Sequence, residues 1–352
     1  MFLKSKARKR ILLINYEMTY TGSPRALYNL AKVLVELKYD VDVCTLNSGM
    51  YEKEFNKIGI GVKEIDLEYV KRNNSEFVAY DFVICNTIFC LEIAYYLQNI
   101  VNTALFIMEA ANLKQLMKNC CLDEMKLCNI KKVFCVSEYA MHEIQKEYNL
   151  KNISILHNYV INVKKRFNIH RKNEKIKFIV SGTIEERKAQ DIAIKAYYLL
   201  SEEQREKSEL YILGASPIWS AEYQEKIEGL ITDGIHVLEA IKDSDELYDF
   251  YNEMDVFLIP SRDESCSLVA LEAAMLKKPI IVSENVGAKY LLCNKKENIV
   301  HTNDETELAK VMMKYVDNSH RIAVDGIKNY FSYKKMGTEK VLKREINRIV
   351  RD

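Results

Sequence analysis

Short apolar segments alternate with longer helical ones along the whole chain, and this alternation constrains the fold more than any other feature. Several of the short segments are apolar at nearly every position, which is typical of parallel strands covered on both faces. Strands and helices that alternate in this way form doubly wound α/β sheets. We expect strands at Ile11–Asn15, Val41–Leu46, Phe82–Cys85, Leu105–Met108, Val133–Val136, Ile153–Leu156, Lys177–Val180, Leu210–Leu213, His236–Leu238, Val256–Ile259 and Ile280–Ser283.

The chain has 352 residues, more than one ordinary hydrophobic core organises, so we expect two domains. The stretch Asn162–Lys175 is polar and without periodicity, which makes it the best candidate for a linker. We predict two Rossmann-like domains, residues 1–160 and 161–334, whose strand carboxyl ends face a shared cleft. The last segment, Lys334–Ile349, is expected to form one basic helix.

Charge and cysteine usage narrow the class of protein. A net charge of +1 argues against a nucleic-acid binder. The nine cysteines are irregularly spaced in a long chain, which predicts free thiols in a reducing, cytoplasmic compartment. Four of them lie close together without a C-x-x-C pair, which favours small buried apolar residues over metal ligands. These four are Cys120, Cys121, Cys128 and Cys135.

The amino terminus is basic, with Lys4, Lys6, Arg8, Lys9 and Arg10 before the first predicted strand. A short strand follows it, which is not the pattern of a secretory signal. No apolar run in the sequence is long enough to span a bilayer. A solvated tail is the simpler interpretation, and peripheral contact with the anionic inner face of a membrane is the alternative.

The first candidate for a functional loop is Thr21–Arg25, directly after the first strand. Gly22 permits a tight turn, Ser23 is a plausible N-cap, and Pro24 is a plausible first helical residue. A helix amino terminus at a strand's carboxyl end suits an anion or a hydroxyl-rich ligand. The local chemistry fits a well-capped structural helix equally well.

The second candidate loop is Ser181–Lys188, between a strand and the helix expected from Gln190. It lacks both the G-x-G-x-x-G and the Walker patterns. It does place two adjacent cations, Arg187 and Lys188, at a helix entrance, where they could neutralise a diphosphate without a metal ion. Taken alone, these two side chains are more often solvated surface charges.

The third candidate loop follows the strand Val256–Ile259 and precedes a helix of about ten residues. Glu264 lies in the loop, and Glu272 lies eight residues on, inside the helix. Phosphates suit the free N–H groups at such a helix end, and a carboxylate is the usual partner of a ribose diol. The backbone groups expected to point toward a ligand are those of Ser267, Leu268 and Val269.

These segments together resemble the signature of retaining GT-B glycosyltransferases of family four. The central match is Pro260-Ser261, Glu264 and Glu272-Ala273-Ala274, ending in Lys278-Pro279-Ile280-Ile281. Ser181–Lys188 resembles that family's donor-phosphate loop, and Thr21–Arg25 resembles its glycine-rich acceptor-side loop. The carboxyl-terminal helix, residues 335–352, resembles one that packs back onto the first domain.

The resemblance implies a role for each matching residue. Glu264 would hold hydroxyls of the donor sugar, and Glu272 would bind the ribose. Lys188, with Arg187, would stabilise the departing diphosphate, and backbone at Gly182, Thr183 and Ser267–Val269 would contact the donor. The remaining group would lie on the acceptor side, namely Gly22, Ser23, Arg25 and Glu109.

No metal ion or resident cofactor is implied, since the family usually needs none. The two Asp-x-Asp sequences have structural explanations. Asp40-Val41-Asp42 begins a strand, and Asp243-Ser244-Asp245 leads into a helix, where Asp and Ser are ordinary N-caps.

Three positions depart from the family's pattern. Thr183 stands where an arginine usually follows the glycine, and Thr21 replaces one of two glycines in the acceptor-side loop. Met108 precedes Glu109 where a histidine commonly contacts the donor sugar.

The sequence therefore predicts a transferase that moves a hexose from a UDP- or GDP-sugar to a glycan, lipid-linked or protein acceptor. Met108 and Thr183 motivate a second hypothesis, a non-catalytic relative that serves as partner subunit of an active transferase. A nucleotide-sugar epimerase is a more distant third.

Overall fold

The structure is a computed structural model that describes residues 8–160, 163, 174–292 and 295–349. The chain divides into two compact units. Unit 1 comprises Met1–Tyr159 and Glu339–Asp352, and unit 2 comprises Val160–Thr338. Most of the predicted linker, Asn162–Lys175, lies outside the described residues, as do Lys4 and Lys6 of the basic amino terminus.

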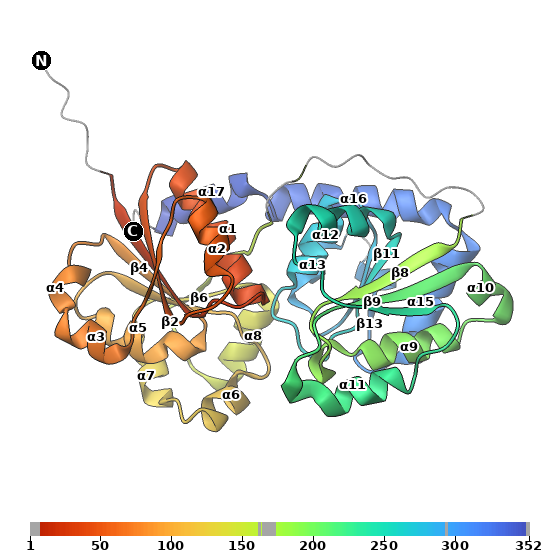
Figure 1. Ribbon diagram of the computed structural model, residues 1–352, viewed down its shortest axis with the longest axis horizontal. Helices are drawn as coiled ribbons and strands as arrows, with labels where there is room; N and C mark the ends of the chain where they lie inside the picture. The colour runs from red at the N-terminus through yellow and green to blue at the C-terminus, as the bar shows by residue number, and fades with distance from the viewer. Residues whose placement is uncertain (1–7, 161–162, 164–173, 293–294, 350–352) are drawn as a thin grey trace, which may run out of the picture. The chain divides into compact units, whose positions relative to one another are not determined.

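Unit 1 is built on a seven-stranded sheet in the order β3-β2-β1-β4-β5-β6-β7, and every strand pair is parallel (Figure 1). Strands β4 and β5 are buried at every position, as expected of a sheet covered on both faces. The strands are β1 (Arg10–Glu17), β2 (Asp40–Asn47), β3 (Val62–Glu64), β4 (Phe82–Asn86), β5 (Thr103–Ile107), β6 (Val133–Cys135) and β7 (Ile153–Ile155).

The helices of unit 1 connect these strands as in a doubly wound fold. They are α1 (Gly22–Glu36), α2 (Glu52–Lys57), α3 (Leu67–Arg72), α4 (Asn74–Phe77), α5 (Leu91–Leu97), α6 (Leu113–Asn119), α7 (Glu124–Cys128) and α8 (Glu138–Glu147), with a 3₁₀ turn η1 (Ile88–Cys90). Helix α17 (Glu339–Ile349) joins them from the far end of the chain and packs against α1. Lys343 on α17 pairs with Glu36 at 3.3 Å, and His157 contacts Glu345 at 2.9 Å.

Unit 2 is a six-stranded parallel sheet in the order β10-β9-β8-β11-β12-β13. Its strands are β8 (Ile176–Ser181), β9 (Ser208–Leu213), β10 (Ile235–Leu238), β11 (Val256–Ile259), β12 (Ile280–Ser283) and β13 (Ile299–Val300). Its helices are α9 (Gln190–Tyr198), α10 (Glu202–Glu206), α11 (Ala221–Glu228), α12 (Ser244–Glu253), α13 (Leu268–Met275), α14 (Lys295–Asn298), α15 (Glu305–Asp317) and α16 (His320–Met336). Three short 3₁₀ turns complete it: η2 (Glu186–Lys188), η3 (Ile218–Ser220) and η4 (Gly287–Leu291).

Helix α9 packs with α15, and α13 packs with α16; in Figure 1, α16 runs along the top of unit 2 and α9 lies in its lower half, above α11. The α13–α16 contact includes one very close approach. A Cβ atom on Gly326 would lie 1.9 Å from the carbonyl oxygen of Lys277, so only glycine fits there. This contact fixes how α16 is rotated about its axis.

These two parallel sheets confirm the predicted α/β class with two Rossmann-like domains, and all eleven expected strands are present. Two strands were not predicted, β3 and β13, which are short strands at sheet edges. The single helix predicted at Lys334–Ile349 is wrong. The chain leaves helix after Met336 and re-enters it at Glu339, and Gly337 between them sits where a Cβ would come within 2.7 Å of Leu271 and Tyr333.

Two smaller predictions are also corrected. Ser23 does not cap its helix, because α1 begins at Gly22 and no side-chain cap forms. Glycine is not required at position 22 either, since its φ is not positive and an added Cβ would meet nothing within 4 Å.

Among the clustered cysteines only Cys135 is buried, whereas Cys120, Cys121 and Cys128 are exposed. The eight cysteines in the described residues are all free thiols.

Every helix among the described residues is too short or too polar to cross a lipid bilayer.

Candidate functional site

At the carboxyl end of the unit 2 sheet, two of the predicted site residues contact the carboxylate of a third. Lys188 donates a hydrogen bond from Nζ to Oε2 of Glu264, and Arg187 donates from Nη1 to the same oxygen at 3.3 Å. Glu264 is nearly buried. Burial alone would raise the pKa of Glu264, but the charges of Lys188 and Arg187 outweigh it, so the pKa is lowered. Glu264 is therefore ionised at neutral pH.

The loop that carries Glu264 is fixed by its backbone. The Glu264 N–H donates to the carbonyl of Asn285 at 3.0 Å, and the Gly287 N–H donates to the carbonyl of Glu264 at 2.8 Å. Arg187 also donates to the carbonyl of Asp263 at 3.0 Å. These bonds tie the loop to the segments after β8 and β12, so the carboxylate position does not depend on the ion pairs alone.

An ion pair between Arg262 and Asp191 also anchors the loop that carries Glu264. Arg262 donates two hydrogen bonds to the buried carboxylate of Asp191, both at 3.1 Å, and Lys226 donates a third at 2.8 Å. Burial opposes ionisation of Asp191, but the bonds from Arg262, Lys226 and Tyr223 lower its pKa to about 2. Asp191 belongs to the first turn of α9, so this pair locks the Glu264 loop onto the helix that follows the Lys188 loop.

The Lys188 loop contains two further predicted residues. Gly182 has φ of +142°, a conformation that side chains rarely adopt, and its Cα faces the aliphatic part of Lys188. A Cβ on Gly214 would lie 1.8 Å from the Gly182 carbonyl oxygen, so the end of β9 also requires glycine. The Thr183 carbonyl accepts a hydrogen bond from Gln190 at 2.9 Å. The loop is thus held in a defined shape beside the cations.

Helix α13 begins four residues after Glu264. Ser267 is its N-cap, with φ of +82°, and its hydroxyl accepts from the Ala270 N–H at 3.2 Å. Leu268 and Val269, the first two helical residues, are half-exposed. Their N–H groups precede the intrahelical ladder and lie at the positive end of the helix dipole. The arrangement presents two N–H donors close to the loop of Glu264 and can accept an anion.

Glu272 stands apart from this cluster. It lies in the second turn of α13 and is completely buried, and the hydroxyl of Tyr248 donates to its Oε1 at 3.3 Å. A ribose could reach this carboxylate only if neighbouring groups moved. The predicted ribose contact is untested by this arrangement and stays a prediction.

The predicted acceptor-side residues lie in unit 1, at the carboxyl ends of its central strands. Asn86 donates hydrogen bonds to Oδ1 of Asn15 at 2.8 Å and to Oγ of Ser23 at 3.0 Å, and Ser23 donates to Asn15 at 3.0 Å. This buried network holds the first turn of α1, which includes Gly22 and the half-buried Arg25. Ser23 therefore has a structural role other than the predicted cap.

Glu109 lies two residues after the end of β5. Its Oε2 accepts from the N–H groups of Ile88 at 3.2 Å and Met108 at 2.9 Å. Burial raises the pKa of Glu109 to about 7, and the backbone N–H groups of Ile88, Met108 and Glu109 itself only partly offset this rise. The Sδ atom of Met108 accepts a weak contact from Asn158 at 4.0 Å.

Sequence reasoning missed the Arg262–Asp191 pair and the Asn15–Asn86 contact. Each joins residues 71 positions apart, and no local pattern signals such a pairing. Reasoning from the sequence did place Asp243 as an N-cap, which is confirmed, since its carboxylate accepts from the Asp245 and Glu246 N–H groups.

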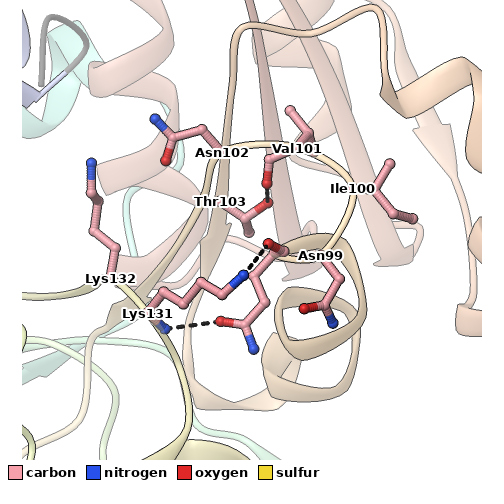
Figure 2. A pocket seen from close by; sticks show the side chains of 8 residues that line it. Asn99, Ile100, Val101, Asn102, Thr103, Lys131 and Lys132 are labelled. Carbon is pink, nitrogen blue, oxygen red and sulfur yellow. Dashed lines mark hydrogen bonds between the residues drawn. The ribbon is translucent and has the colours of Figure 1, made fainter.

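A cavity of about 280 Å³ lies at the opposite edge of the unit 1 sheet, where β5 and β6 begin (Figure 2). Its cationic groups are already engaged. Lys131 donates from Nζ to the Gln98 carbonyl at 3.1 Å, and Lys132 lies over the Phe82 ring at 5.2 Å. Ligands of open α/β sheets bind at the other edge, so this cavity is not the candidate site.

One group of potential metal ligands occurs among the described residues, formed by His301, Asp304 and Glu307. All three are explained by the start of α15. Asp304 caps the Glu307 N–H at 2.7 Å, and Glu307 accepts from the His301 backbone at 2.7 Å. None of them belongs to the predicted donor loops.

Part of the sequence of unit 2 matches a family model. Residues 175–318 match the family model described as glycosyl transferases group 1. The matched segment contains Lys188, Glu264, Glu272 and the α13 amino terminus. No curated protein matches the sequence.

Solved structures match nearly the whole chain and share its GT-B glycosyltransferase fold. HepE from Anabaena, solved in complex with UDP and glucose, is 14% identical, with a TM-score of 0.81, over 97% of this chain and 99% of HepE. Sucrose-phosphate synthase from Thermosynechococcus elongatus is 16% identical, with a TM-score of 0.78, over 98% of each chain. A glycosyltransferase from Rickettsia africae is 16% identical, with a TM-score of 0.77, again over 98% of each. At these low sequence identities, the structural similarity establishes the fold alone.

Proposed function

We propose that this chain is a retaining hexosyltransferase that uses a UDP- or GDP-sugar and requires no metal ion. The observation that carries the proposal is the carboxylate of Glu264 held between Lys188 and Arg187, beside the amino terminus of α13. The family match of residues 175–318 and the UDP–glucose complex of HepE support it.

The ion cluster suggests how the donor would bind. Phosphate oxygens are stronger acceptors for Lys188 and Arg187 than a carboxylate already shared between two cations. A bound diphosphate would draw both cations toward itself and toward the N–H groups of α13. Glu264 would then be released to accept hydrogen bonds from hydroxyls of the sugar. In this scheme the unliganded cluster keeps every charge neutralised until a donor arrives.

The reaction would break the bond between the anomeric carbon and the diphosphate oxygen and form a bond to the acceptor oxygen on the same face. The acceptor proton would pass to the departing diphosphate. Lys188, Arg187 and the α13 N–H groups would stabilise the negative charge that develops there, a contribution worth a factor of about 10²–10³ per donor group. The acceptor, a glycan, lipid-linked or protein hydroxyl, would contact the unit 1 edge of Ser23, Arg25 and Glu109. The free cysteines support a cytoplasmic location.

A non-catalytic partner subunit is the second candidate, favoured by one observation. Met108 is apolar and already contacts Asn158, so it supplies no strong donor for a sugar hydroxyl. Such a subunit would retain the donor pocket without turnover.

A panel of UDP- and GDP-sugars separates these candidates. A true donor at a hundredfold its dissociation constant adds about 2.7 kcal/mol of stability and raises the melting temperature. Nucleotide release by the isolated chain with a stabilising donor and an acceptor mixture would establish the transferase. Stabilisation without turnover, together with a stable complex with an active transferase, would establish the partner subunit. Isomerised sugar would instead indicate an epimerase.

A further inference from the structure

Helix α16 presents an outward stripe that mixes apolar and cationic side chains. Val324, Ile327 and Phe331 are 36%, 40% and 60% exposed, although large apolar side chains are usually buried. Lys328 and Lys335 are exposed on the same helix. At 100° per residue these five positions fall within an arc of about 100°. We call these five residues the α16 stripe.

The opposite face of α16 is the one that packs into unit 2. It buries Ile322, Gly326, Asn329 and Tyr333, and Gly326 lies against the Lys277 backbone. The helix cannot turn the α16 stripe inward without breaking that contact. The exposure of the stripe is therefore built into the fold and is not a consequence of a loosely attached helix.

The charged residues of α16 are mostly cationic. Helix α16 carries Arg321, Lys328, Lys334 and Lys335, and its single carboxylate, Asp325, is buried. Asp325 accepts from the Tyr315 hydroxyl at 3.1 Å and lies 3.8 Å from Lys328. The Asp325 carboxylate is buried beneath Lys328, and the charged groups that this helix exposes to solvent are cationic, so the surface is complementary to a negatively charged partner.

We propose that the α16 stripe binds an anionic lipid surface. A convex helix face with Phe331 between lysines suits the plane of a bilayer, where the ring enters the headgroup region and the lysines extend toward phosphates. Two other occupants fit less well. A second copy of this chain would set lysine against lysine. The segment 161–173 is itself basic, containing Lys164, Lys165, Arg166, Arg171 and Lys172.

The proposal is independent of the transferase activity, because the stripe contains none of the candidate donor residues. Each lysine close to an anionic membrane contributes about 1 kcal/mol, or about fivefold in affinity. Removal of Lys328 and Lys335 together should weaken binding about 25-fold. Loss of the Phe331 ring should weaken it about tenfold.

The test is flotation of the full chain with phosphatidylcholine vesicles, with and without phosphatidylglycerol. We expect binding only to the vesicles that contain phosphatidylglycerol, a decrease with added salt, and the losses above for Lys328→Gln with Lys335→Gln and for Phe331→Ser. All three side chains are exposed, so the variants should keep the melting temperature of the wild type.

Two control variants match these changes elsewhere on unit 2. Ile218→Ser with Trp219→Ser removes an apolar pair that is even more exposed, 94% and 77%. Lys310→Gln with Lys314→Gln removes two exposed lysines from the neighbouring helix α15. Both controls should float as the wild type does.

Several results would overturn the proposal. These are no binding to anionic vesicles, equal losses in the control variants, and binding that depends on Lys4 and Lys6 but not on α16. Self-association that Phe331→Ser abolishes, without vesicle binding, would assign the stripe to a second copy. A defined protein complex with the same dependence, and no vesicle binding, would assign it to a protein partner.

Discussion

Glu109 in unit 1 and Glu264 in unit 2 both lie just beyond the carboxyl ends of inner strands, and the two side chains differ in charge. Glu264 in unit 2 is paired with two cations, and its pKa is lowered. Glu109 in unit 1 is held by two backbone N–H groups, and burial raises its pKa to about 7. Burial disfavours the ion in both places, so the neighbouring charges decide the outcome. One fold can thus hold a permanent anion at one sheet edge and a titrating acid at the other.

The largest expected effect is that of Glu264→Gln on turnover. Glutamine removes the charge that Lys188 and Arg187 neutralise, and it removes the acceptor proposed for the sugar hydroxyls. Turnover should fall at least about a hundredfold. Affinity for UDP or GDP should not fall, because the two cations lose a competing partner. Nucleotide-release assays and calorimetry measure the two quantities.

Glu185→Gln is a matched control for this variant, because Glu185 also pairs with Arg187, at 2.7 Å, but is not a predicted sugar contact. It should keep most of the activity. Full turnover of Glu264→Gln would remove Glu264 from the proposed chemistry.

The next effect concerns nucleotide binding. Glu272→Ala should weaken UDP or GDP binding by about 1.5–3 kcal/mol, the range for hydrogen bonds to a charged group. Tyr248→Phe should have a smaller effect, since it removes only the hydroxyl that contacts Glu272. Calorimetric titration of both variants, with the exposed Glu253→Ala on α12 as control, measures this. Unchanged affinity in Glu272→Ala would withdraw the ribose role.

A smaller effect should appear in the pH dependence of stability. The folded pKa of Glu109 is above its unfolded value, so the folded state binds more protons between about pH 4.5 and 7. The group's contribution to the free energy of unfolding therefore declines as pH rises through that window. The side chain in Glu109→Gln stays neutral at every pH. As pH rises from 5 to 8, the free energy of unfolding of this variant should therefore increase by up to about 2 kcal/mol relative to that of the wild type. Urea denaturation at both pH values measures this.

Glu264→Gln should show the opposite sign when urea denaturation is extended below pH 5. Its folded pKa is lowered, so the ion pair stabilises the fold above the unfolded pKa and is lost as pH falls. The exposed Glu138→Gln is the control and should show neither trend. The same trend in both buried variants would contradict the assigned charge states.

The last prediction is that removal of metal ions has no effect on turnover. Turnover should persist in excess EDTA, because Lys188 and Arg187 supply the positive charge proposed for the diphosphate. Activity that is abolished by EDTA and restored by Mg²⁺ or Mn²⁺ would show that the protein side chains alone are insufficient.

Much of the fold was predictable because its signals are local. The strands were recognisable from apolar runs, and Glu264 and Glu272 from a strand–loop–helix pattern. Strand β3 was missed because Val62–Glu64 is a short, largely exposed edge segment. At the break after Met336, Leu271 and Tyr333 pack closely around Gly337. Tyr333 belongs to the preceding helix α16, but Leu271 belongs to α13, which is distant in sequence.

The sequence predicted which loops and helices carry the candidate residues, but not how their side chains pair. Lys188 and Glu264 were assigned to different parts of a donor, yet they contact one another across 76 positions of sequence. Burial raises the pKa of Glu109, and the N–H of Ile88, which comes from a different strand end, partly offsets that rise. Such contacts arise from sheet order, which a one-dimensional pattern does not specify.

The close approach of Gly326 to Lys277 has a consequence for how this protein can change over generations. Because that contact sets the rotation of α16, substitutions on the outer side of the helix leave its seating undisturbed. Phe331 or Lys335 could therefore be exchanged for other residues, and the binding proposed for the α16 stripe could change, while the sheet edge that holds Glu264 stays intact.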